Sequence, residues 1–314
     1  MWEYVVLGVV AFLILALFIT LYIIYYITFK SPHKNQGDHY DLPREISSKE
    51  ITEKIIRYID KLKDVPYEQV CIKSYDGHIL YGKYYHNKAG APLDIAFHGY
   101  RGTDIRDLAG CLTTIQDGQR NMLLITQRAH GKSKGRYLTF GIKERKDCLS
   151  WVNYAIERFG GDVRILLRGV SMGAATVLMA TGLNLPKNVY GVLADCPYSS
   201  VKEVIKKVVK DDIKLNAKLV YPLIWLSARV FCGVSLNKIT AENQVVKTKV
   251  PIIIYHGTED QFVPAYMSEC VQKVKPDIER HLFSGAGHAL SYMVDTERYE
   301  KILKEFINKH CPKN

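Results

Sequence analysis

The sequence predicts an α/β fold: a mostly parallel central sheet with helices on both faces and a helical cap, preceded by one transmembrane helix. Three observations lead to this prediction. Short apolar runs alternate with helical patterns over most of the chain, as in repeated βα units. One segment, residues 199–246, breaks the alternation because it carries helical patterns alone. An uncharged run, residues 4–29, precedes all of these elements.

The composition is that of a folded globular protein. The chain has 314 residues, of which 47% are apolar and 24% charged, which allows a substantial core and argues against disorder. The net charge of +11 is scattered and accompanies no nucleic-acid motif, so we expect a membrane neighbour and no nucleic acid. The seven cysteines include no CxxC pair, which argues against structural zinc and a disulfide framework and favours a reducing compartment. The oligomeric state has no signature in the sequence.

The N-terminal run is long enough to span a bilayer. Tyr4 to Phe29 has 26 residues, which as a helix rising about 1.5 Å per residue exceeds a hydrocarbon core of about 30 Å. A cleaved signal peptide is the alternative. The charged residue before the run is the acidic Glu3, however, where a signal peptide would carry basic residues. Lys30, Lys34 and Arg44 follow the run. The positive-inside rule therefore predicts a single-pass protein of the cell membrane with its catalytic domain in the cytoplasm.

Three parts follow from this organisation. Residues 1–30 are expected to form the transmembrane anchor, and residues 31–45 a polar linker. Residues 46–314 are expected to form one domain. It begins with apolar residues at helical spacing over 51–62 and continues with a β-hairpin over 67–85 that turns at an Asp-Gly pair.

The rest of the domain alternates between strands and helices. The expected strands are residues 94–97, 121–126, 164–167, 190–194, 250–255 and 280–283. The clearest helices are residues 142–159, 172–183, 265–274 and 296–309. Residues 199–246 are expected to be an inserted cap, whose apolar stretch 219–228 is too short to span a membrane. That stretch could line an acyl pocket or simply pack the cap.

A nucleophilic serine is the first candidate catalytic residue. The pattern G-x-S-x-G occurs twice, around Ser133 and around Ser171, so the motif alone does not identify the nucleophile. A nucleophile elbow needs a strand that leads into a strained turn and then a helix, with small residues two positions before and after the serine. Residues 164–168 supply the strand for Ser171 and residues 172–178 supply the helix, whereas Ser133 lies in an expected loop. The context therefore favours Ser171.

A base and an acid for this serine occur downstream. A serine hydroxyl needs a base to take its proton, and the base needs an acid partner that holds its tautomer. Asp260 and His288 each lie just after a predicted strand, in loops that would meet at one edge of a parallel sheet. Glu259 and Asp195 remain alternative acids, the second because it also ends a strand.

The order Ser171, Asp260, His288 resembles that of the alpha/beta-hydrolase superfamily, and the resemblance extends over residues 67–309. The loop from Arg128 to Ser133, which follows the expected strand 121–126, also resembles a loop that members of the family carry after the corresponding strand. The segments that carry the resemblance are His98-Gly99-Tyr100, Gly169-Val170-Ser171-Met172-Gly173, His256-Gly257-Thr258-Glu259-Asp260-Gln261-Phe262-Val263-Pro264 and Gly287-His288.

The resemblance implies a chemical role for each candidate. Ser171 would attack an acyl carbonyl, His288 would act as general base and then as general acid, and Asp260 would orient the imidazole. The oxyanion donors would be the backbone N–H groups of Met172 and Tyr100, and losing one such donor typically costs about 3 kcal/mol of transition-state stabilisation. No metal or organic cofactor is required.

Two neighbouring residues are expected to be structural. We interpret His98 as a hydrogen-bonding residue of the fold and Cys196 as a small buried residue.

The expected function is therefore a serine hydrolase that cleaves small-molecule acyl esters or thioesters near a membrane, through an acyl-enzyme intermediate. A serine peptidase of the same fold is the first alternative, because the same triad cleaves amides. A catalytically silent membrane-tethered binding protein is the second, and the intact serine, histidine and aspartate argue against it.

Overall fold

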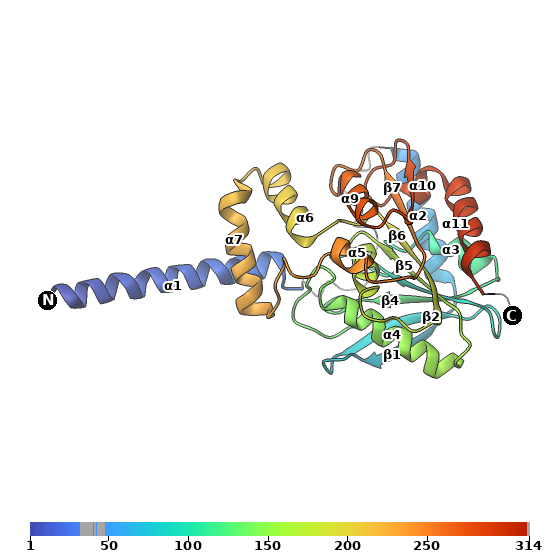
Figure 1. Ribbon diagram of the computed structural model, residues 1–314, viewed down its shortest axis with the longest axis horizontal. Coiled ribbons are helices and arrows are strands. Elements are labelled where there is room, and N and C mark those ends of the chain that lie inside the picture. Colours follow the sequence, from blue (N-terminus) through green and yellow to red (C-terminus); the bar gives the residue numbers. More distant parts are fainter. Residues whose placement is uncertain (32–39, 41, 43–47, 313–314) are drawn as a thin grey trace.

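A single eight-stranded sheet forms the centre of the molecule (Figure 1). The computed structural model describes residues 1–31, 40, 42 and 48–312. The strands lie in the order β1-β2-β4-β3-β5-β6-β7-β8; β2 is antiparallel to β1 and β4, and the strands from β3 to β8 run parallel. Their bounds are β1 Glu68–Lys73, β2 Ile79–Tyr85, β3 Leu93–Phe97, β4 Asn121–Thr126, β5 Ile165–Val170, β6 Val189–Asp195, β7 Ile252–Gly257 and β8 Glu279–Phe283.

Helices cover both faces of the sheet, which is why the central strands are buried almost from end to end. One face packs against α4 (Glu144–Phe159), α5 (Met172–Ala180), α8 (Ala241–Val245) and α9 (Tyr266–Val274). The other packs against α2 (Lys49–Asp64), α3 (Cys111–Gln116), α10 (Ser291–Val294) and α11 (Thr296–His310). The three-layer α/β architecture predicted from the alternating pattern is confirmed.

The observed elements match the predicted ones closely. The predicted strand at 121–126 has the observed bounds, and the hairpin over 67–85 is present. The helix expected over 172–183 ends earlier, at Ala180. The short helices α3 and α10 were not predicted, because six and four residues are too few to establish an apolar periodicity.

The segment 199–246 is helical in the structure. It contains α6 (Val201–Lys207), α7 (Ala217–Ser227) and two π-helical turns, η1 (Val208–Asp212) and η2 (Ala228–Cys232), before α8. Helices α6 and α7 and both turns pack in a third apolar cluster with residues of α1 and the loop 138–142. This cluster also includes Met172 and Val263, so it lies at the carboxyl ends of the parallel strands. Helix α8 packs instead on α5 and α9, in the helical layer of the sheet.

Helix α1 (Trp2–Thr28) projects from the rest of the molecule, and α7 lies across it (Figure 1). It is long and apolar enough to cross a membrane, a property that a signal sequence would share. Its C-terminal part contacts the domain: Leu21 and Phe29, which directly follows the helix, are buried, and the Ser227 hydroxyl donates to the Leu21 carbonyl at 2.8 Å.

Candidate active site

Ser171 lies at the sharp turn between β5 and α5, in a backbone conformation that L-residues rarely adopt. Its φ is 55° and its ψ is −115°. The turn brings backbone atoms very close together: a Cβ added at Gly169 would lie 2.2 Å from the Gly173 carbonyl oxygen, and one added at Gly173 would lie 2.0 Å from the Phe97 carbonyl oxygen. The two glycines of the motif are therefore required for the turn to form.

This close approach makes a testable prediction. We expect Gly173→Ala to lower the free energy of unfolding by about 3 kcal/mol, because the Phe97 carbonyl belongs to a central strand and cannot move aside. The melting temperature should fall by about 5–10 °C in a thermal unfolding experiment. Gly161→Ala is the matched control, because a Cβ at Gly161 would meet no atom within 4 Å. Equal melting temperatures for the two variants would show that the turn tolerates a side chain.

The structure brings the three predicted catalytic side chains together. The Ser171 Oγ lies 2.9 Å from the His288 Nε2, and the His288 Nδ1 lies 2.7 Å from the Asp260 Oδ2. Asp260 follows β7 and His288 follows β8, so both come from loops at the carboxyl ends of parallel strands, as does Ser171. The geometry is that of a serine, its base and the acid partner of the base.

Asp260 is held as a buried carboxylate. Its Oδ1 accepts backbone N–H groups from Phe262 at 3.0 Å and Val263 at 2.7 Å, while its Oδ2 faces both His288 and His256. Burial alone would raise the pKa of Asp260, but the two histidines and the Val263 N–H outweigh burial and lower this pKa to about 2. Asp260 is thus ionised at any physiological pH.

The environment of His288 favours its protonated form. Burial alone would lower the pKa of His288, but the Asp260 carboxylate, which bonds to Nδ1, holds this pKa well above the ordinary 6.5. A proton on Nε2 prevents the ring from accepting the Ser171 proton. An activity that depends on this base should therefore rise with pH until His288 is deprotonated.

The two alternative acids occupy other positions. The Asp195 Oδ1 accepts a hydrogen bond from the Ser291 hydroxyl at 3.2 Å, and burial raises the pKa of Asp195 to about 6. The side chain of Glu259 is exposed. Of the three acids considered, Asp260 is the one whose carboxylate bonds to the His288 ring.

Ser133 of the second G-x-S-x-G pattern is buried in a structural role. Its hydroxyl donates to the Thr126 carbonyl at 2.6 Å and accepts the Tyr81 N–H at 2.9 Å. The same loop begins with Arg128, whose buried guanidinium forms ion pairs with Asp147 at 2.5 Å and Asp76 at 2.9 Å. The loop from Arg128 to Ser133 therefore joins β4 to the hairpin and to α4.

The loop after β3 carries the proposed oxyanion donor Tyr100 and is fixed from several sides. The Gly99 N–H donates to the Asp107 carboxylate at 2.8 Å, and the Arg101 N–H donates to the His130 Nε2 at 3.1 Å. Burial lowers the pKa of His130 to about 3, so its ring stays neutral and can accept this bond. The Tyr100 ring stacks on Phe140 with centroids 5.1 Å apart.

The backbone N–H groups of the two proposed oxyanion donors have no backbone partner among the described residues. Within residues 48–312 and the other described positions, the N–H groups of Tyr100 and Met172 donate to no protein acceptor. Met172 is the first residue of α5, where a backbone N–H has no partner within its own helix. His98, between β3 and this loop, accepts the Gln127 N–H at 3.1 Å, the structural role predicted for it.

An apolar cavity of about 250 Å³ lies beside Ser171, between the sheet edge, the cap and the end of α1. Tyr100, Ser171 and Val263 line it from the sheet side. The cap and α1 contribute mainly aliphatic side chains: Ile27, Val204, Ile205, Val208, Val209, Ile213 and Ile224. Arg101 is the charged residue among those that line the cavity. A neutral, apolar group is the ligand that such walls favour.

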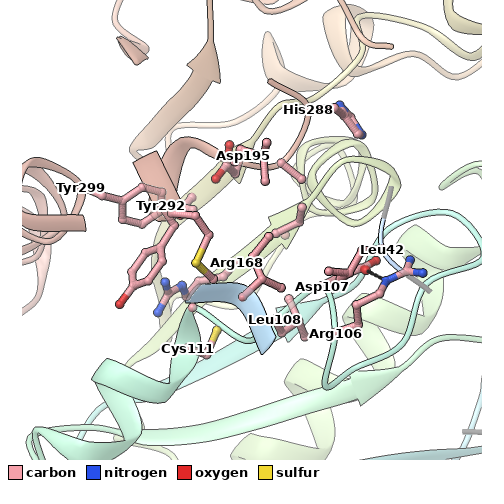
Figure 2. A pocket seen from close by; sticks show the side chains of 18 residues that line it. Leu42, Arg106, Asp107, Leu108, Cys111, Arg168, Asp195, His288, Tyr292 and Tyr299 are labelled. Carbon is pink, nitrogen blue, oxygen red and sulfur yellow. Dashed lines mark hydrogen bonds and ion pairs between the residues drawn. The ribbon is translucent and has the colours of Figure 1, made fainter. Parts of the chain in front are cut away.

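Figure 2 shows a second and smaller cavity, of about 90 Å³, on the sheet face covered by α2, α3 and α10. Asp195 and His288 lie along one side of it, and Tyr292 and Cys111 lie on the other sides (Figure 2). The residues that line it do not include Ser171, which lines the cavity of about 250 Å³. The larger cavity beside Ser171 is therefore the better candidate for a substrate site.

Cys196 was not predicted to touch the site, yet its side chain lies beside the triad. Donor atoms of Cys196, Asp260 and His288 lie within 4.8 Å of one another, so among the residues that the structure describes these three are the group placed to hold a metal ion. Two of them already bond to each other in the triad. Burial raises the pKa of Cys196 to about 11, so it remains a neutral thiol and a poor nucleophile near neutral pH.

Comparisons with known proteins agree with this fold. No protein-family model matches the chain. The uncharacterized protein YqkD of Bacillus subtilis is 23% identical over 189 residues, which span 60% of this chain and 62% of YqkD, less than two thirds of its length.

Solved structures with the same fold include two hydrolases of Pyrococcus. The Pyrococcus furiosus esterase Pf2001 has a TM-score of 0.61 and 25% identity, covering 80% of this chain and 96% of that chain. The Pyrococcus horikoshii acylaminoacyl peptidase has a TM-score of 0.59 and 17% identity, covering 81% of this chain and 43% of that chain. The chain therefore has the alpha/beta-hydrolase fold, as its motifs predict.

Proposed function

We propose that the protein is a serine hydrolase that cleaves acyl esters or thioesters. The observation that carries this proposal is the hydrogen-bonded series from Ser171 through His288 to Asp260, next to a cavity with apolar walls. Apolar walls suit a neutral acyl chain. The similarity in fold to an esterase of Pyrococcus furiosus supports the same class of reaction.

The proposed reaction has two acyl transfers. His288 takes the hydroxyl proton of Ser171 as Oγ attacks the acyl carbonyl, and the N–H groups of Tyr100 and Met172 stabilise the oxyanion. His288 then gives this proton to the leaving alcohol or thiol. A water molecule, deprotonated by the same ring, attacks the acyl-enzyme, and the acid product leaves with Ser171 restored.

A substrate panel tests the reaction class. We expect purified protein to hydrolyse p-nitrophenyl butyrate faster than any aminoacyl-naphthylamide, because the cavity walls are aliphatic and carry one charged side chain, Arg101. Ser171→Ala protein gives the background rate. Faster cleavage of the naphthylamides, with a strong side-chain preference, would favour the peptidase function instead. The fold that the chain shares with an acylaminoacyl peptidase makes that the second candidate.

We also propose that α1 stays attached and crosses the membrane once, with the hydrolase domain on the cytoplasmic side. Lys30, Lys34 and Arg44 follow the helix, and no Lys or Arg precedes it. Leu21 and Phe29 are buried against the domain, so removing the helix as a signal peptide would expose apolar surface next to the active site.

A further inference from the structure

The last turn of α1 is part of the candidate active site. Ile27 and Thr28 line the same cavity as Ser171. The Tyr100 hydroxyl donates to the Thr28 carbonyl at 3.0 Å, and the Arg101 guanidinium donates to the Ile27 carbonyl at 2.5 Å. The last carbonyls of a helix have no partner within it, and here the loop that carries the proposed oxyanion donor supplies the partners. The helix therefore forms a wall of the cavity as well as an anchor.

The exposed part of α1 is about as long as a bilayer is thick. Residues 2–20 are exposed, except for Ala16, which is half-buried. At about 1.5 Å per residue they would span about 28 Å, close to the roughly 30 Å of a hydrocarbon core. The helix meets the cap from Phe18 onward: the rings of Phe18, Tyr22 and Tyr25 lie 5.6, 5.7 and 5.2 Å from the ring of Phe231. A membrane that contains the exposed part would therefore reach the level of the cap.

The cap presents an apolar surface at that level. Helix α7 lies across α1 (Figure 1), so it would lie parallel to a membrane that α1 crosses. Leu219, at 71% exposure, and Val230, at 52%, are exposed on α7 and η2. Pro222, Leu223 and Leu226 lie between them at helical spacing and are exposed or half-buried. We call Leu219, Pro222, Leu223, Leu226 and Val230 the outer face of the cap.

Residues around the outer face also suit a lipid surface. Ile213 and Leu215, in the turn before α7, are 55% and 52% exposed. Four basic side chains in the same region are exposed, beside two acidic ones: Lys210, Lys214, Lys218 and Arg229, with Asp211 and Asp212. Exposed apolar groups among basic ones are typical of a surface that lies in the interfacial layer of a membrane.

We propose that the outer face of the cap lies in the leaflet that α1 enters, and that the enzyme takes its substrate directly from the bilayer. This proposal rests on the proposed function and names its substrate class: an acyl ester dissolved in the membrane. The acyl chain passes Ile27 and Ile213 into the cavity and brings its carbonyl to Ser171. At about 250 Å³ the cavity accommodates one acyl chain or the part of it next to the carbonyl, and not a whole two-chain lipid.

The test compares a water-soluble and a membrane-dissolved ester on the full-length protein in phosphatidylcholine vesicles. The substrates are p-nitrophenyl acetate and p-nitrophenyl palmitate, and the variant is the double substitution Leu219→Glu and Val230→Glu. We expect hydrolysis of the palmitate to fall at least about tenfold, because two carboxylates replace apolar groups that lie among lipids. Hydrolysis of the acetate should stay within about twofold, because neither residue lines the cavity.

The matched control is the double substitution Val246→Glu and Val274→Glu. Val246, which directly follows α8, is 54% exposed, and Val274, the last residue of α9, is 45% exposed. Both helices belong to the helical layer of the sheet. The control should hydrolyse both esters as the wild type does. Phosphatidylcholine carries no net charge, so the vesicles do not repel the introduced glutamates by their charge.

The outcomes separate this proposal from the function on which it rests. Equal palmitate rates for the cap variant and the wild type would overturn delivery from the bilayer while acetate hydrolysis still supported the hydrolase. An equal loss of palmitate hydrolysis in the control would overturn it too, because the effect would not belong to the outer face of the cap. A wild type that hydrolyses neither ester would contradict the hydrolase itself.

Discussion

Replacing Ser171 with alanine is expected to abolish labelling by a fluorophosphonate probe and to lower ester hydrolysis about 10⁶-fold. The hydroxyl is the atom that would form the acyl-enzyme, and it lies 2.9 Å from the His288 Nε2. Alanine retains the Cβ and removes only the oxygen, so the elbow should fold normally. Gel fluorescence of the labelled protein and a p-nitrophenyl butyrate assay provide the two measurements.

Ser133→Ala is the matched control for this prediction. Ser133 has the same G-x-S-x-G context, but its hydroxyl bonds to the Thr126 carbonyl and the Tyr81 N–H. Its loss should cost about 1–3 kcal/mol of folding stability and leave labelling intact in the folded protein. If Ser171→Ala protein were labelled as strongly as the wild type, the assignment of the nucleophile would be wrong.

Replacing Asp260 with asparagine should lower kcat about 10⁴-fold. The asparagine amide can donate to the His288 Nδ1, and the neutral ring then carries its proton on Nε2. In that tautomer Nε2 cannot accept the Ser171 proton. The variant loses the negative charge that helps to raise the pKa of His288. The residual activity should therefore rise with pH at a lower pH than in the wild type, as a pH–rate profile would measure.

Asp195→Asn is the control for the acid. Asp195 is buried close to the site, but its carboxylate bonds to Ser291, and a substitution that leaves this bond possible should change kcat less than about tenfold. The opposite pattern, with a large loss for Asp195→Asn and a small one for Asp260→Asn, would assign the acid to the strand β6.

The sequence carried enough information to predict the sheet and the three side chains of the triad. The central strands were short apolar runs bounded by turn residues, and the buried faces of a parallel sheet require such runs. Ser171, Asp260 and His288 all follow strands, so one topological rule was sufficient to predict that they meet. The two segments with the pattern G-x-S-x-G were distinguished by their context, since of the two only the one around Ser171 lies between a strand and a helix.

Other parts of the site had no signal in the sequence. His130 lies in the loop from Arg128 to Ser133, but its bond to the Arg101 N–H depends on how two loops pack. Cys196 lies next to a predicted strand end, and its proximity to His288 follows from the turn that it makes, with φ of 49°. The contribution of Ile27 and Thr28 was missed because the apolar run was assigned to a membrane alone. Periodicity identifies a buried surface and does not identify what covers it.

Peptide mapping of the fluorophosphonate adduct tests the central claim most directly. Full-length protein would be labelled at alkaline pH, which favours the neutral form of His288, then digested and sequenced by tandem mass spectrometry. We expect one phosphonylated residue, Ser171, and no adduct when His288 is replaced with alanine. An adduct on Ser133 or another side chain, or active protein that carries no adduct at Ser171, would contradict the account.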